Sequence, residues 1–169
     1  RRFYMTAIFD THAHYDDEQF DTDRDELLNS MAAGGVGTIV DAAATVESWD
    51  KIVELAEKYS FIYGSVGVHP DEVGALNEEN FARMRELLKK EKIVAVGEIG
   101  LDYYWDNSPR EVQKKWFERQ LELAREVDLP VIIHIDSQIK RIAHTRFIRY
   151  TLSGNIIRHT MHRRGIYNR

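Results

Sequence analysis

The sequence contains no cysteine among its 169 residues, which excludes both a disulfide framework and a metal site built on thiolates. Any bound metal ion would therefore be held by nitrogen and oxygen atoms. No run of about 18 apolar residues occurs, so we expect no membrane-spanning helix. Residues 1–10 lack the apolar stretch of a signal peptide, and we expect a cytoplasmic protein.

Acidic residues are scarce at one end of the chain. Residues 135–169 contain 8 Lys and Arg against 1 acidic residue, whereas residues 1–134 contain 15 against 27. We therefore divide the chain into a domain over residues 5–134 and a basic tail of unknown structure over residues 135–169.

Short apolar runs alternate with amphipathic stretches throughout residues 5–134. We predict strands at 6–14, 36–43, 61–70, 92–104 and 129–134, with helices at 21–35, 46–59, 77–92 and 108–128. The continuous apolar runs suit a parallel sheet that is covered on both faces. Capping boxes are expected at Asp23 with Glu26 and at Ser108 with Glu111.

Polar residues fall near the C-terminal ends of successive predicted strands. They are His12, His14, Asp41, His69, Glu98, Asp102 and His134. An open doubly wound sheet places its ligand in one crevice, whereas functional residues above strand after strand are typical of a barrel. We predict an α/β fold, a TIM (β/α)₈-type barrel truncated to about five βα units.

The stretch FDTHAH, residues 9–14, places Asp10, His12 and His14 on one face of a strand, because residues i and i+2 point the same way. Two imidazoles so placed can bind one divalent ion. The alternative is a chance pair of surface histidines.

Two further predicted strands contain polar, ionisable residues that are rare in a core strand. Glu98 lies in an apolar strand, where a charge is costly to bury unless it is paired or bound to a metal, and His134 ends PVIIH. Three histidines with one carboxylate are a donor set for a two-metal hydrolytic site, in which Glu98 would be the bridging and catalytic residue.

FDTHAH, GVHP, GEIGLDYY and LPVIIH follow one another in this order. Together they closely resemble the TatD family of metal-dependent deoxyribonucleases, within the amidohydrolase-like TIM barrels. The resemblance implies hydrolysis of phosphodiester bonds in DNA with two divalent ions (Mg²⁺, Mn²⁺ or Zn²⁺). It also implies that His12, His14, Glu98 and His134 are metal ligands. The family uses two more ligands, a histidine after the sixth strand and an aspartate after the eighth.

Several neighbouring residues leave alternatives open. His69 either lines the pocket or stiffens a turn. Asp102 either bonds a ligand histidine or caps a loop. The aromatic residues 103–105 either stack on nucleic-acid bases or pack the loop onto the barrel.

After His134 we find no family motif and expect no sixth strand. A frameshift is the favoured explanation of the tail, ahead of a divergent C-terminus and a DNA-binding extension; His159 in NIIRH is a weak candidate for the missing histidine. A partial barrel would leave the first and fifth strands as exposed edges. We therefore expect low stability, oligomerisation through those edges and impaired activity. The rival functions are a hydrolase of an amide or lactone and a non-catalytic or misfolded metal-binding fragment.

Overall fold

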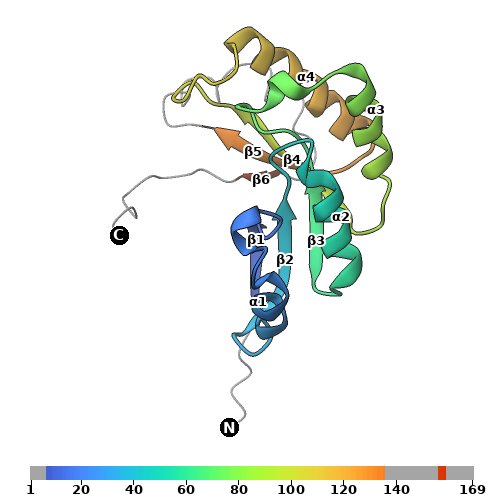
Figure 1. Cartoon of the computed structure of the whole chain (residues 1–169). Helices are drawn as coiled ribbons and strands as arrows, with labels where there is room; N and C mark the ends of the chain where they lie inside the picture. Colours follow the sequence, from blue (N-terminus) through green and yellow to red (C-terminus); the bar gives the residue numbers. More distant parts are fainter. Residues whose placement is uncertain (1–6, 136–155, 159–169) are drawn as a thin grey trace.

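Six parallel strands lie side by side in the order of the chain, β1-β2-β3-β4-β5-β6 (Figure 1). The computed structural model describes residues 7–135 and 156–158. The strands are β1 Ile8–Ala13, β2 Val36–Ala42, β3 Ile62–Val66, β4 Ile93–Leu101, β5 Val131–Ile135 and β6 Ile156–Arg158. Successive parallel neighbours joined by helices form one side of a barrel, which confirms the predicted fold class.

Helices connect the strands from β1 to β5. They are α1 Arg24–Ser30, α2 Ser48–Lys58, α3 Glu78–Leu87 and α4 Arg110–Glu126, with 3₁₀ turns η1 Glu18–Phe20 and η2 Val73–Ala75. None of these helices in the described part of the chain is long and apolar enough to cross a membrane.

The sheet is buried on both faces, as its continuous apolar strands predicted. Trp49, Ile52 and Phe117 from the helices pack with Val66, Val96 and other strand residues in the main core. A smaller group, Val40, Ala42, Ala95 and Ile132, comes from β2, β4 and β5. Since neighbours along a strand point to opposite faces, Val40 lies on the face opposite Ile39, which packs with α1 and α2.

The prediction that no sixth strand exists is wrong. Ile156–Arg158 pairs in parallel with β5, opposite Val131–Ile133. The free edge of β5 offers unpaired backbone groups, which the three residues of β6 satisfy. β5 is therefore not an edge of the described sheet, whereas β1 is, and Ile8 and Phe9 on it are more than half exposed.

Both predicted capping boxes are also wrong. Asp23 precedes α1 but its side chain makes no capping hydrogen bond. The Ser108 hydroxyl donates to the carbonyl of Asp71 at 2.9 Å, and α4 has Pro109 at its N-cap with no side-chain capping hydrogen bond. The capping box that does form joins Asn77 and Asn80 at the start of α3.

Candidate metal centre

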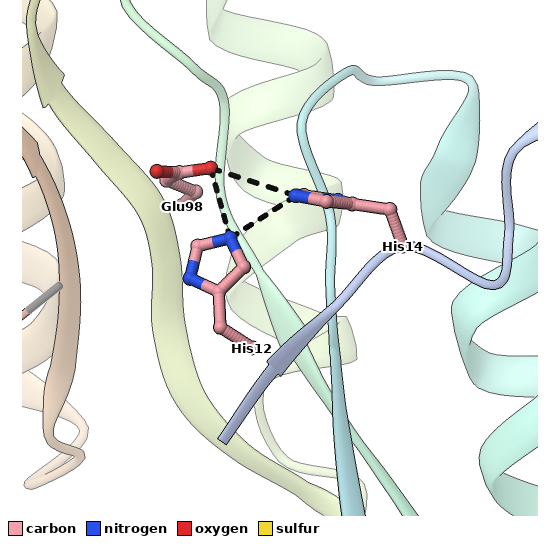
Figure 2. A group of neighbouring side chains, drawn as sticks. All are labelled: His12, His14 and Glu98. Carbon is pink, nitrogen blue, oxygen red and sulfur yellow. Dashed lines mark hydrogen bonds and ion pairs between the residues drawn. The ribbon is translucent and has the colours of Figure 1, made fainter. Parts of the chain in front are cut away.

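His12, His14 and Glu98 converge at the C-terminal end of the sheet (Figure 2). His12 lies in β1, His14 directly follows it, and Glu98 lies in β4. The two Nε2 atoms are 3.0 Å apart, and Glu98 Oε2 lies 3.3 Å from that of His12 and 3.9 Å from that of His14. His12 and Glu98 are 86 positions apart in the sequence, yet together with His14 they present three donor atoms to one point.

The backbone near β1 orients these two histidines. His14 Nδ1 lies 2.8 Å from the carbonyl oxygen of Ala42, so Nδ1 carries the proton and donates it. The lone pair on Nε2 then faces Glu98, as a metal ligand requires. The backbone N–H of His12 donates to Asp10 Oδ1 at 3.1 Å, which places Asp10 in support of the strand.

A second group of donors shares Glu98. His69, Glu98 and His134 each offer a ligand atom within 4.8 Å of the others. His134 Nδ1 lies 3.2 Å from Glu98 Oε1, and the rings of His69 and His134 are in edge contact at 4.1 Å between centroids. One oxygen of Glu98 therefore faces each group of histidines.

Asp102 holds His134 from the other side. Its Oδ2 accepts a hydrogen bond from Nε2 of His134 at 2.9 Å. With that proton on Nε2, the atom of His134 that can bind an ion is Nδ1, which faces Glu98. Of the two alternatives for Asp102, the structure therefore places it against the histidine, and it also accepts from loop amides.

His69 contributes to both a turn and the pocket. Its Nδ1 accepts a hydrogen bond from the backbone N–H of Asp71 at 3.3 Å, and its carbonyl accepts one from Glu72. Its ring also lines the cavity above the strands, so neither of the two alternatives excludes the other.

The protonation states of Glu98 and His69 favour cation binding. Burial alone would raise the pKa of Glu98, but the hydrogen bonds from His12 and His134 hold it well below its usual range. Burial and the neighbouring His134 lower the pKa of His69 to about 4, so its imidazole is neutral near pH 7. Burial would lower the pKa of His134, but Glu98 and Asp102 raise it, so an ion bound by His134 would have to displace the proton that Nδ1 shares with Glu98. An ionised carboxylate and a neutral imidazole are the forms that bind metals.

The donor set fits a divalent ion. Four imidazoles and a carboxylate that is 4% exposed supply only nitrogen and oxygen ligands. A buried carboxylate surrounded by histidines is costly unless positive charge compensates it. Zn²⁺ and Mn²⁺ accept such mixed ligands, and Mg²⁺ accepts carboxylate with water.

The centre opens into a cavity of about 610 Å³. His14, His69, Glu98 and His134 form one part of its wall. Asp16, Asp71 and Glu72 from the loops after β1 and β3 form another part. The volume is within the usual range of small-molecule sites.

The sequence reasoning missed two supporting residues. Asp71 lines the cavity two residues after His69, a spacing that could have drawn attention to it. Gln113 is fully buried in α4, accepts from the backbone N–H of Asp102 and donates to the carbonyls of Asp102 and Ser108. A lone glutamine in an amphipathic helix carries no sequence signal for such a role.

Asp41 follows the same strand-end pattern but does not join the donors. It is fully buried, and its Oδ1 accepts the backbone N–H of Tyr15 at 2.6 Å, while Oδ2 has no hydrogen-bond partner. Burial, aided by nearby Asp16, raises the pKa of Asp41 to about 8.

Asp41→Asn is expected to stabilise the protein more at about pH 8 than at about pH 5. The folded protein keeps a proton on Asp41 that the unfolded chain loses above about pH 4, so the stability of the wild type falls as pH rises through this window. Asparagine cannot ionise, so the variant should gain roughly 2–4 kcal/mol relative to wild type across it. Urea unfolding at both pH values measures this. Exposed Asp50→Asn is the control, and a gain equal to its gain would contradict the assignment.

Comparison with known proteins identifies the family of this chain. A profile of the TatD related DNase family matches residues 9–164. The chain belongs to this family. The match continues past residue 134, where the TatD sequence motifs cease to be recognisable, and it includes β6.

Three known proteins illustrate what the chain is similar to. An uncharacterized metal-dependent hydrolase, YabD of Bacillus subtilis, is 45% identical over 75% of this chain and 50% of its own length. A 3'-5' ssDNA/RNA exonuclease TatD of Cronobacter sakazakii is 36% identical over 83% of this chain and 52% of its own. The crystal structure of YjjV, a TatD homolog from Escherichia coli, superposes with a TM-score of 0.75 at 34% identity, covering 82% of this chain and 54% of that one. The chain thus spans about half the length of these relatives.

The TatD sequence motifs assign no role to Asp102. Its hydrogen bond to His134 therefore predicts a role in metal binding that can be tested separately. Asp102→Asn is expected to weaken metal binding about 10–100-fold, the usual effect of losing the partner of a ligand histidine. Titration calorimetry with Mn²⁺ measures the change. Asp106→Asn, which alters an exposed carboxylate four residues along, should bind as wild type, and equal losses in the two variants would contradict the role.

Proposed function

We propose that this chain carries the metal centre of a hydrolase that cleaves phosphodiester bonds in nucleic acid, with DNA as the substrate. One observation carries the proposal. The two oxygens of buried Glu98 face two separate groups of histidines, His12 with His14 and His69 with His134. A shared carboxylate between two sets of nitrogen ligands is the arrangement that holds a pair of divalent ions.

The residues of the chain have distinct tasks in such a reaction. His12, His14, Glu98 and His134 would hold the ions, with His69 as a further ligand that the family resemblance does not include. The ions, when bound, supply activated water and compensate the charge that develops on the phosphate. Asp102 keeps the proton of His134 on Nε2, away from the ion.

The nature of the substrate is supported by the relatives. The Cronobacter relative is described as a 3'-5' ssDNA/RNA exonuclease, and a Danio rerio relative, 33% identical over 79% of this chain, as a putative deoxyribonuclease. Phosphate esters are among the substrates that a pair of cations suits, because both the attacking and the leaving oxygen need stabilisation.

The test is cleavage of end-labelled single- and double-stranded DNA by this chain with Mg²⁺, Mn²⁺ or Zn²⁺. We expect metal-dependent release of nucleotides, loss of activity after treatment with a chelator, and recovery when the ion is restored. Cleavage that persists with the chelator, or no cleavage with any of the three ions by a chain that circular dichroism shows to be folded, would overturn the proposal. An amide and a lactone assayed beside the DNA test the rival hydrolase.

A further inference from the structure

We propose that Tyr104 and Trp105 form a stacking platform for the bases of a single-stranded nucleic acid whose backbone lies in the metal centre. The inference rests on the proposed function and goes beyond it, since it assigns the residues that contact bases. The platform lies in the loop between β4 and α4, drawn in yellow in Figure 1.

The exposure of these two rings is unusual for the described residues. The large hydrophobic side chains that are exposed there are Ile8, Phe9, Tyr104 and Trp105. Ile8 and Phe9 lie on β1 at the edge of the described sheet, which accounts for them. Tyr104 and Trp105 are 56% and 53% exposed, and no strand edge explains them.

The third aromatic residue of the loop, Tyr103, packs the loop against the main core. Tyr103 is partly buried against the main core, and the guanidinium of Arg110 lies over its ring at 4.5 Å from the centroid. Tyr103 thus fixes the loop to the domain, and the two rings that follow it are left to face outward.

The loop is fixed before any ligand arrives. Asp102 Oδ1 accepts the backbone N–H groups of Tyr104 and Trp105, at 2.8 and 3.1 Å. Gln113 bonds the carbonyls of Asp102 and Ser108 at 2.9 Å each. A loop whose backbone is already ordered loses less conformational entropy when a ligand binds, which is what a binding platform needs.

The same carboxylate connects the platform to the metal centre. While Oδ1 of Asp102 holds the backbone of Tyr104 and Trp105, its Oδ2 holds His134. The amides of the platform are therefore one carboxylate away from a candidate metal ligand. Tyr104 and Trp105 are not among the residues that line the cavity, so the platform would contact bases that flank the nucleotide whose phosphate lies at the centre.

Unpaired bases are the ligands on which exposed aromatic rings can stack. The two rings meet in a T-shape, with centroids 5.0 Å apart and planes at 87°. Each base has an open face for such rings only when the strand is unpaired, because a duplex covers both faces by its own stacking. Stacking is also tolerant of sequence, since every base has such a face.

The test compares two oligonucleotides of equal length, one with thymine bases and one with abasic sites throughout. Their binding to this chain is measured by fluorescence anisotropy with Ca²⁺ present. We expect Tyr104→Ala with Trp105→Ala to weaken binding of the thymine strand about 10–100-fold, from stacking on the order of 1–3 kcal/mol per base. The abasic strand should bind the variant as it binds wild type, and Tyr104→Phe with Trp105→Phe should restore affinity for the thymine strand.

Three results would overturn the platform: wild type that binds neither strand, a double alanine variant that keeps full affinity for thymine, or equal losses for both strands. The proposed function is assessed separately, by hydrolysis of bis(4-nitrophenyl) phosphate by wild type with Mn²⁺. That ester has no nucleobase, so failure there with intact base-dependent binding would count against the metal centre and leave the platform supported.

Discussion

Glu98→Gln is expected to abolish metal binding and the proposed phosphodiester hydrolysis, because Glu98 lies between the two histidine groups. The amide keeps the shape of the side chain but removes the negative charge that both groups share. A bound metal contributes several kcal/mol to such a reaction, and each 1.36 kcal/mol is a factor of ten, so activity should fall at least about a thousandfold. Cleavage of end-labelled DNA with Mn²⁺ measures the loss.

Thermal melting provides a second readout for Glu98 that needs no catalysis. At a metal concentration about 100 times Kd, binding stabilises the wild type by about 2.7 kcal/mol, equivalent to a rise in Tm of roughly 5–11 °C for a chain of this size. The Glu98→Gln variant should show almost none of this rise. Glu126→Gln is the matched control, because Glu126 is exposed on α4 and pairs with Arg85. A Glu98→Gln variant that keeps the full rise in Tm would exclude Glu98 as a ligand.

Gly100→Ala is expected to disrupt the pairing of β4 with β5. Gly100 lies opposite His134 in the register, and a Cβ atom there would lie 1.8 Å from the carbonyl oxygen of His134. That atom belongs to the backbone, so no side-chain rotation can relieve the overlap, and β5 would have to move. We expect a loss of more than about 3 kcal/mol in the free energy of unfolding, above the usual range for overpacking.

Urea unfolding measures the stability of Gly100→Ala. If the variant folds, calorimetric titration with Mn²⁺ measures metal binding as well, because a displaced β5 would move His134. Gly74→Ala is the control, since its nearest neighbour for an added Cβ is Ser108 Oγ at 3.8 Å, an ordinary contact. Its stability should stay within about 0.5 kcal/mol of wild type. Equal stabilities for the two variants would show that β4 and β5 do not approach as closely as the structure has them.

Periodicity predicted the first five strands and four helices because each is a short apolar or amphipathic run between clear breaks. The pairing of β6 could not be predicted, because three residues, Ile156–Arg158, carry too little pattern. The predicted cap at Ser108 failed for a tertiary reason. The Ser108 hydroxyl bonds another loop, and no local motif encodes that contact.

The candidate site was predictable to the extent that strand geometry governs it. The i, i+2 spacing brought His12 and His14 together, and a glutamate in an apolar strand marked Glu98. The place of His69 in the second donor group depends on the conformation of a loop. Its burial and its edge contact with His134 arise only when the chain folds, so the sequence could not predict them. Asp41 shares the strand-end position of the donors but is not one of them. Such a position does not say which face of the sheet a side chain occupies.

The order of the strands in space equals their order in the chain, which has a consequence for biosynthesis. Each new strand can pair with the one that left the ribosome just before it, so the sheet can grow from its N-terminal side during translation. The donors emerge in the same sequence: His12 and His14 first, then His69 and Glu98, and His134 last. Once β4 has emerged from the ribosome, the nascent chain therefore already contains the first group of three donors. A cation bound by that group would stabilise the incomplete sheet before β5 is synthesised.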